Sequence, residues 1–423
     1  MARDPVRVQR LLLRFFLVLI ALGACVAILI PAGRGWDFAN FYDTGSRAAA
    51  GQLRDIYNPG SLIHGQTPQG QMAFWGAPIS AWLYTPLSIF SPAVALVLLK
   101  LVATLSFGIG LFLLYQLMKP YAERNSTTTV LWYSTTFAAL ILLYQPFWTI
   151  FRVGGQTTPI AFLFLVLGLR YHLRAKYLET ALCLLLVVLV KPAFVFVPAV
   201  LALVSGRRFF LSIAGVFAVT AVASVLLFGL PIHREFLDIL RRGSEKPSPW
   251  PFNSSLYILA DVLRPVSHSI PVVRAGGWIP DALRSVMKFL VLGVFVTLSL
   301  GSARQNWTGE RRRLFWYLMA ISFTLLISQV VWEHYLAVLF IPLAFLVALV
   351  PRMTSVARIH LALIFGLSVL QNLILVLFVR DHIPITNSAS LLLVSAVKAG
   401  PLLAYLAFLW LRRNFLFQQV ALA

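Results

Sequence analysis

An aspartate with the chemistry of a general base stands in the first polar segment of this 423-residue sequence. Asp37 lies in an aromatic stretch that runs from Trp36 to Asp43. A carboxylate in such a place can take the proton of an attacking hydroxyl group. Partial desolvation by neighbouring rings raises a carboxyl pKa and makes the group a stronger base. A second interpretation is structural, because aspartate is also a preferred N-terminal cap of a helix.

Four more polar residues at the ends of apolar runs are candidates for binding an anion or a sugar. Lys191 separates two short apolar runs, and a cation beside helix ends can hold a phosphate group. A lysine there can equally extend its ammonium group to the membrane surface, and Arg152 has the same two interpretations. Gln156 follows two glycines, so it can bond sugar hydroxyls or the backbone groups that the glycines leave open. His334 can orient a phosphate or a base, or act as a structural hydrogen-bonding residue.

Metal, disulfide and nucleotide chemistry have little support in the sequence. Glu333 and His334 are adjacent, so on a helix their side chains diverge by about 100° and make a poor metal pair. Cys25 and Cys183 each lie inside an apolar run and are interpreted as buried small residues. A glycine-rich phosphate-binding loop is missing. We therefore expect no required cofactor, and nothing in the sequence supports a divalent metal.

The elements that must position these residues are membrane helices. Hydrophobic residues make up 60% of the chain and charged residues 12%, against about 25% charged in soluble domains. Apolar runs of about 20 residues recur, as spanning helices require. We predict an all-α, polytopic transmembrane bundle of about 10–12 helices, the lower count applying if the short runs on either side of Lys191 re-enter instead of crossing. The predicted runs are 11–31, 93–117, 130–150, 157–171, 178–190, 193–205, 209–229, 282–302, 314–331, 335–350, 359–379 and 390–411.

The formal net charge of +21 is explained by membrane orientation. Most basic residues lie in short loops at the ends of apolar runs, where they mark the cytoplasmic side. No basic stripe or aromatic platform accompanies them, so no nucleic-acid partner is expected. This distribution predicts cytoplasmic N- and C-termini in a bacterial inner (plasma) membrane. It also predicts one transmembrane domain over 1–423 with two large extracytoplasmic loops, 32–92 carrying Asp37 and 230–281.

Several short motifs, in their order along the chain, resemble the integral-membrane glycosyltransferases of the GT-C class. Within that class the chain is similar to glycosyltransferase family 87, the polyprenol-phosphate-mannose-dependent mannosyltransferase-like group. The resemblance extends from Trp36 to about Pro342. The fragments that carry it are Asp37-Phe38 with Tyr42, Gly51 to Tyr57, Tyr84-Thr85-Pro86-Leu87, Gly155-Gln156, Lys191-Pro192, Asn253-Ser254-Ser255-Leu256 and Ser328 to Tyr335.

The resemblance implies a GT-C-like helix bundle whose active site faces the extracytoplasmic side. It implies transfer of a sugar, with mannose the first choice, from a polyprenyl-phosphate donor to a lipid or glycan acceptor, with inversion at the anomeric carbon. Asp37 matches the general base, and Asp43 is the second choice. The residues that would contact the donor phosphate or sugar are Lys191, Gln156, His334, Arg152, Tyr84 and Asn253.

An alternative of another class is a transporter or flippase for a lipid-linked sugar. In such a protein the outer carboxylates would couple protons or conformations. Inverted repeats and ionisable residues near the bilayer midplane are typical of such transporters. The sequence shows no such repeat, and its polar residues gather at the predicted outer boundary.

Overall fold

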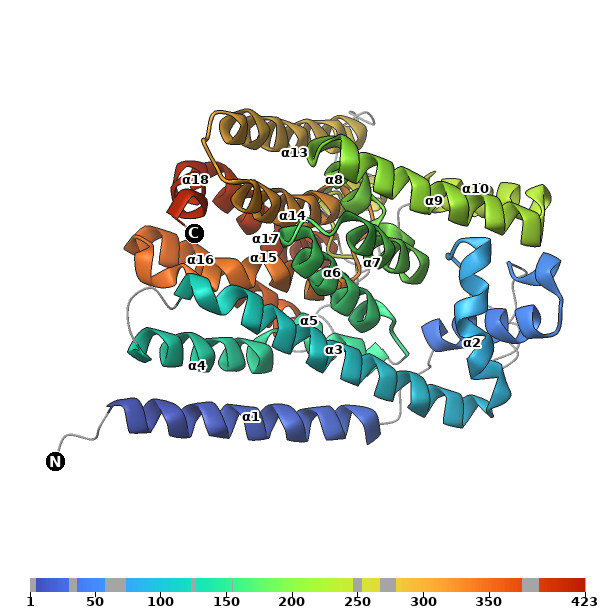
Figure 1. Ribbon diagram of the computed structural model, residues 1–423, viewed down its shortest axis with the longest axis horizontal. Helices are drawn as coiled ribbons and strands as arrows, with labels where there is room; N and C mark the ends of the chain where they lie inside the picture. The colour runs from blue at the N-terminus through green and yellow to red at the C-terminus, as the bar shows by residue number, and fades with distance from the viewer. Residues whose placement is uncertain are drawn as a thin grey trace. The chain divides into compact units, whose positions relative to one another are not determined.

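The computed structural model describes residues 5–29, 36–57, 74–122, 127–153, 155–245, 253–266, 279–374 and 388–422. All regular elements in these ranges are helices (Figure 1). Among the described residues, the one extended pairing is an isolated antiparallel bridge between Asn253 and Trp332. The predicted all-α helix bundle is therefore confirmed.

Within the described residues, each predicted apolar run overlaps a helix. The run 130–150 is broken, because α4 (Thr127–Leu143) and α5 (Gln145–Val153) are bent by 48° where they meet. The run 193–205 begins with a short 3-10 turn, η3 (Pro192–Phe194). The helices are α1 (Pro5–Leu29), α3 (Pro92–Ala122), α4 (Thr127–Leu143), α5 (Gln145–Val153), α6 (Thr158–Leu173), α7 (Tyr177–Val190), α8 (Phe196–Val204), α9 (Arg207–Phe228), α13 (Ile279–Ala303), α14 (Gly309–Ile327), α15 (Leu336–Ala348), α16 (Ser355–Ile374) and α17 (Ser388–Leu411).

Within the described residues, five helices are long and apolar enough to cross a membrane, or six if α4 and α5 form one bent span. The five lie in α1, α3, α9, α13 and α17. The chain is thus a multi-pass membrane protein. The helices α7 and α8, on either side of Lys191, are shorter than the roughly 20 residues of a full span. Whether these two helices cross the membrane or re-enter it stays a prediction.

The two predicted outer loops contain helices of their own. The first holds α2 (Trp36–Ala49) and two 3-10 segments, η1 (Leu53–Asp55) and η2 (Pro78–Ile89). The second holds α10 (Leu230–Glu245) and α11 (Ile258–Val266). A C-terminal helix, α18 (Arg413–Leu422), was not predicted, because it carries no long apolar run. The remaining short segments are η4 (Glu333–Tyr335) and η5 (Val350–Arg352).

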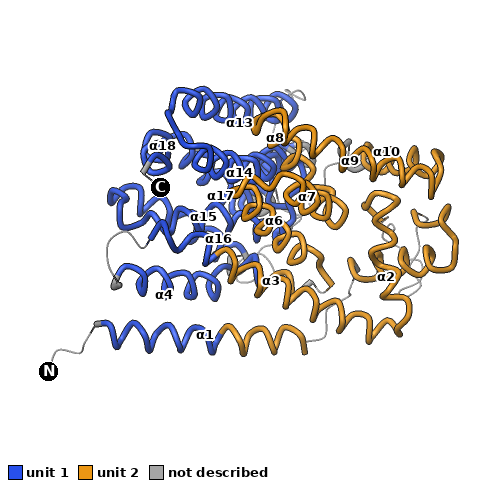
Figure 2. Tube along the Cα trace, in the orientation of Figure 1, with its two compact units in different colours: residues 1–19, 115–147, 247–423 blue, residues 20–114, 148–246 orange. Residues whose placement is uncertain are grey.

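The chain divides into two compact units, which Figure 2 colours separately. Unit 1 comprises 1–19, 115–147 and 247–423, and unit 2 comprises 20–114 and 148–246. In unit 1 the core is α15, in which every residue is buried. A helix that is apolar on all sides is expected in such a position.

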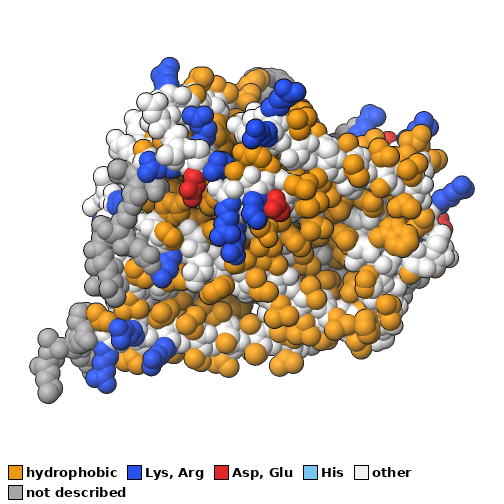
Figure 3. All heavy atoms as spheres, in the orientation of Figure 1, with side chains coloured by type: hydrophobic (Ala, Val, Ile, Leu, Met, Phe, Trp, Pro, Cys, Tyr) orange, Lys and Arg blue, Asp and Glu red, His pale blue; other side chains and the backbone are white. Residues whose placement is uncertain are grey.

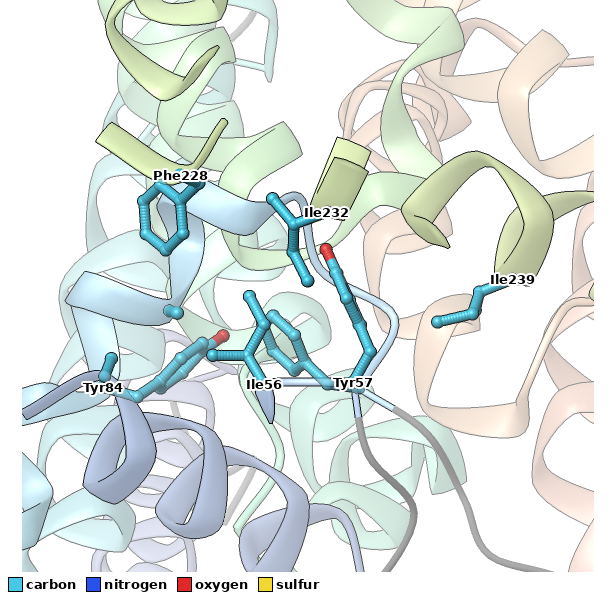
Figure 4. Packing of buried hydrophobic residues seen from close by; sticks show 9 residues of the cluster. Ile56, Tyr57, Tyr84, Phe228, Ile232 and Ile239 are labelled. Carbon is cyan, nitrogen blue, oxygen red and sulfur yellow. The ribbon is translucent and has the colours of Figure 1, made fainter. Parts of the chain in front are cut away.

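In unit 2, an aromatic and aliphatic cluster joins the first outer loop to α9 and α10. Figure 4 shows Tyr57 and Tyr84 from the loop beside Phe228 and Ile232. The Tyr57 hydroxyl donates a hydrogen bond of 2.6 Å to the carbonyl of Gly76. The cluster therefore packs the first outer loop against α9 and α10.

The surface of the candidate spans is apolar. Hydrophobic side chains cover broad areas of the face seen in Figure 3. On α1, Leu11, Phe15 and Leu22 are each more than half exposed, and on α9 Val219 and Leu226 are exposed still further. An apolar surface this extensive is unfavourable in water. It is the surface expected of helices in contact with lipid.

Candidate active site

Asp37, Gln156 and Lys191, all in unit 2, form one chain of hydrogen bonds. The Gln156 Nε2 group donates to Asp37 Oδ2. The Lys191 ammonium group donates to Gln156 Oε1 at 3.1 Å. Gln156 is 1% exposed and Lys191 8% exposed, whereas Asp37 is half-buried. The structure thus brings together a carboxylate and an ammonium group with a single amide between them.

The first turn of α2 positions Asp37. The next residue, Phe38, is buried against Ala95 and Leu99 of α3. This packing fixes the rotation of α2 and leaves the neighbouring Asp37 beside the turn that carries Gln156. Asp37 lies inside the first turn of the helix, and its side chain bonds to another side chain.

Gly155 allows α2 to approach this turn closely. Its φ angle of +70° is in the left-handed region that favours glycine. A Cβ atom added to Gly155 would lie 2.4 Å from the Cβ atom of Phe38. Glycine is therefore required here both by the backbone angle and by the contact, and it brings Gln156 up to Asp37.

Lys191 is positioned by the end of α7. Its backbone amide bonds to Val187 O at 2.8 Å, and Pro192 then prevents the helix from continuing. Thr157, at the start of α6, donates from Oγ1 to Val190 O at 3.3 Å. The ends of α6 and α7 that carry Gln156 and Lys191 are thus tied together.

Lys191 lies at a helix end, outside the five candidate spans. Burial lowers the pKa of its ammonium group from 10.5 to about 8, although the nearby Asp37 carboxylate opposes this shift. Burial disfavours the charged form, and an opposite charge favours it. At neutral pH the group is still mostly a cation, and it loses its proton just above that pH.

Tyr84 belongs to the same neighbourhood through Thr157. The two side chains share a hydrogen bond, and burial raises the pKa of the Tyr84 phenol, so the phenol stays protonated. Its ring stacks on Phe41 of α2 with centroids 4.7 Å apart. A Cβ atom on Gly45 would lie 2.3 Å from the carbonyl oxygen of Tyr84, so α2 and η2 are in backbone contact. Tyr84 therefore connects the site to the cluster of Figure 4.

Two other predicted site residues are Asp43 and Arg152. Asp43 is buried on α2 at 3% exposure. It lies six residues after Asp37, which is about 240° around the helix, so the two carboxylates are on different sides of α2. Arg152 lies in the last turn of α5, and its side chain is outside the described residues.

His334 and Asn253 belong to a second polar group, in unit 1. Asn253 pairs with Trp332, and its Oδ1 atom accepts a bond from the Val331 amide at 2.9 Å. His334 is buried in η4, with its ring 4.7 Å from that of Tyr335. The structure thus joins the two segments that carry these residues.

The model of glycosyltransferase family 87 matches residues 74–329, which is more than half of the chain. The chain belongs to glycosyltransferase family 87. The predicted resemblance is therefore confirmed, and the protein is a membrane glycosyltransferase, which moves a sugar from a donor to an acceptor. The matched region contains Gln156, Lys191 and Asn253, whereas Asp37 precedes it. No curated protein matches the chain.

Sequence reasoning missed a fully buried charge of this family 87 transferase. Lys398, in α17, is fully buried and forms an ion pair with Glu333. Its carbonyl oxygen accepts a bond of 2.9 Å from Gln371 Nε2. The signal was available, since a lysine inside an apolar span is costly and often functional. Its partner Glu333 lies in the polar hairpin that also carries His334.

The described residues contain no group of three or more His, Cys, Asp or Glu side chains placed to hold a metal ion. The candidate base is linked through Gln156 to the ammonium group of Lys191.

Proposed function

We propose that this membrane glycosyltransferase transfers a hexose, with mannose the first choice, from a polyprenyl-phosphate donor to a hydroxyl group of a lipid or glycan acceptor. The observation that supports the proposal is the chain of hydrogen bonds from Asp37 through Gln156 to Lys191. One end of this series of hydrogen bonds is a base, the Asp37 carboxylate, and the other end is a cation, the Lys191 ammonium group. A transfer from a phosphate-linked donor needs both.

Asp37 acts as the general base, and Asp43 remains the second choice. The acceptor oxygen attacks the anomeric carbon of the donor sugar as the bond from that carbon to the phosphate oxygen breaks. The hydroxyl proton moves to the Asp37 carboxylate, and the bonding electron pair leaves with the phosphate. A single displacement of this kind inverts the anomeric centre. Because phosphate leaves as a stabilised anion, one well-placed base is sufficient.

Lys191 stabilises the departing phosphate. Its ammonium group is buried, and an electrostatic interaction is stronger in a buried site than in water. This fixed positive charge supplies what a metal would otherwise supply, so we propose that no cofactor is required. Gln156 orients both groups, and Tyr84 supports the turn through Thr157. The contacts predicted for Arg152, His334 and Asn253 stay predictions.

We further propose that the reaction takes place on the extracytoplasmic side of a bacterial inner membrane. The N-terminal half of α1 carries Arg7, Arg10 and Arg14, and α2 with Asp37 follows its other end in sequence. Basic residues favour the cytoplasmic side. The start of α1 is then cytoplasmic, and Asp37 lies at the outer surface, where a polyprenyl-linked sugar is presented by the outer leaflet. The C-terminus is proposed to be cytoplasmic as well.

Reconstitution tests this proposal against the flippase alternative. The purified protein is placed in liposomes with radiolabelled polyprenyl-phosphate mannose and a bacterial lipid extract as acceptor. We expect a new glycosidic product and free polyprenyl phosphate. Movement of intact donor across the bilayer without any product would contradict the proposal and indicate a transporter.

A further inference from the structure

In unit 2, helix α10 follows the candidate span α9 with a single residue between them. The span ends at Phe228, and Gly229, with a φ angle of +77°, turns the chain before α10 begins at Leu230. His233 fastens this turn, because its Nδ1 group donates to Gly229 O at 2.7 Å and its Nε2 atom shares a hydrogen bond of 2.8 Å with Ser224 Oγ. Ser224 lies about one helical turn inside α9. The first turn of α10 is therefore held at the level where this span leaves the membrane.

One face of α10 is covered by the first outer loop. Ile232 and Ile239 are buried in the cluster that Figure 4 shows. Between them in sequence, the ring of Phe236 lies 6.1 Å from the ring of Tyr57. The three residues follow one another at intervals of four and three, so they lie on one side of the helix. Their contacts decide which side of α10 is turned away from the protein.

The opposite face of α10 is exposed and alternates leucine with arginine. Leu230 and Leu237 are 59% and 62% exposed, and the side chains of Arg234 and Arg241 are exposed as well. The four residues follow one another at intervals of four, three and four. On an ideal helix they form one stripe about 60° wide, roughly opposite the buried isoleucines.

The surroundings of this stripe indicate that a lipid surface covers it. The stripe continues the exposed apolar surface of α9, to which Leu226 and Leu227 belong. In the loop that packs on the other face of α10, η2 leaves Trp82 nearly half exposed, and tryptophan is enriched at membrane surfaces. A helix face of leucine and arginine suits this boundary, because the leucines reach the acyl chains while the guanidinium groups stay among the headgroups.

The charge of the exposed face selects among lipids. Its arginines, Arg234 and Arg241, outnumber its one exposed carboxylate, Asp238, which lies at the edge of the stripe. Each basic residue close to an anionic membrane surface adds attraction. A guanidinium group also matches the geometry of phosphate oxygens. Anionic headgroups are therefore favoured over zwitterionic ones.

We propose that α10 is an interfacial helix whose stripe of Leu230, Arg234, Leu237 and Arg241 binds anionic phospholipid headgroups beside the end of α9. The other face of the same helix packs on the loop that carries α2 and η2. Bound headgroups thus support the first outer loop from outside. This lipid surface is independent of the sugar donor and the acceptor of the reaction.

Competition between lipids at a fluorescent label on Leu237→Cys tests the proposal. The full-length protein, with Cys25→Ser and Cys183→Ser, is reconstituted in nanodiscs that contain phosphatidylcholine with a nitroxide quencher near its headgroup. We expect this lipid to quench the label. Unlabelled phosphatidylglycerol should relieve the quenching at least about fivefold more effectively than unlabelled phosphatidylcholine, the preference that one basic residue gives. At a label on Val219→Cys, an exposed position in the middle of α9, the two lipids should compete equally.

Charge variants on α10 separate the role of arginine from general lipid contact. Arg234→Gln should lower the preference for phosphatidylglycerol at Leu237 by about fivefold. Asp238→Asn is the matched control, because it removes the opposite charge from the edge of the same face and should keep or raise the preference. Quenching of the Val219 label in each variant verifies that the protein is inserted.

Three outcomes would overturn the proposal. The first is a Leu237 label that is quenched by iodide in water and not by the lipid, which would place α10 away from the bilayer. The second is a label that neither quencher reaches, which would indicate a protein partner on this face. The third is equal competition by the two lipids at Leu237, or the same preference in Arg234→Gln as in the wild type.

Discussion

Lys191 donates a hydrogen bond of 3.1 Å to Gln156, and neither side chain is more than 8% exposed. The same amide donates to Asp37 from its other end. Gln156 therefore decides where the proposed base and the proposed phosphate-binding cation lie relative to each other. Gly155 and Thr157, which flank Gln156 in sequence, position its side-chain amide.

Gln156→Ala should lower kcat for transfer by about a hundredfold. The reason is geometric, because displacement of a catalytic group by about 1 Å can cost that much. Steady-state kinetics with saturating donor measure the effect. Gln419→Ala is the control, since Gln419 is also buried but lies in α18 of unit 1. Equal losses in the two variants would show that a buried glutamine matters only for folding.

Gly155→Ala should abolish transfer, whereas Gly51→Ala should not. Both glycines have φ near +70°, so each alanine carries about 1–2 kcal/mol of backbone strain. Only at Gly155 does the added Cβ meet another residue, Phe38, while nothing lies within 4 Å at Gly51. Thermal unfolding in detergent should show the backbone strain alone in Gly51→Ala and a larger destabilisation in Gly155→Ala, where the contact with Phe38 adds to the strain. If Gly51→Ala lost transfer as fully as Gly155→Ala, the contact with Phe38 would not be the cause.

Donor binding should weaken as the pH rises from 7 to 9. Lys191, with a pKa lowered to about 8, loses its proton in this range and with it the attraction for the donor phosphate. The KM for the donor should therefore increase above pH 8 in the wild-type enzyme. Lys191→Arg should remove this transition, because arginine stays charged. A wild-type donor KM that is constant from pH 7 to 9 would argue against Lys191 as the phosphate contact.

Breaking the buried ion pair should be far more destabilising than breaking an exposed one. Glu333→Gln or Lys398→Met alone leaves a buried charge without its partner, which costs about 3–5 kcal/mol. The double variant should recover most of this loss. Lys176→Met breaks an exposed pair with Glu179 and should cost less than about 1 kcal/mol. Unfolding in detergent compares the four proteins. Similar losses for Lys398→Met and Lys176→Met would contradict the ion pair.

The apolar helices of this fold could be predicted because length and apolarity define them, whereas α18 has no long apolar run and was not predicted. The site could be predicted only in part. Asp37 and Gln156 are 119 residues apart in sequence, and neither residue's surroundings reveal the contact. It depends on the positive φ of Gly155 and on the packing of Phe38. Resemblance to the family brought the two residues into one hypothesis, and the folded chain supplies the hydrogen bond.

Lys398 shows a second reason why sequence reasoning falls short. A single lysine in an apolar run can extend its ammonium group to the membrane surface or stay buried with a carboxylate. The choice depends on Glu333, which lies 65 residues earlier on a hairpin whose position is fixed by Asn253. In the sequence Glu333 stands out only as a neighbour of His334, so its ion pair with Lys398 is not visible there.

Transfer by Asp37→Asn tests the central claim most directly. The asparagine keeps the size of the side chain and removes its basicity, so the variant should insert and fold as the wild type does. We predict that kcat for formation of the glycosidic product falls by at least about a hundredfold, the contribution of a general base, while donor binding is retained. Asp43→Asn serves as the comparison on the same helix. Full activity of Asp37→Asn in reconstituted liposomes would contradict the account.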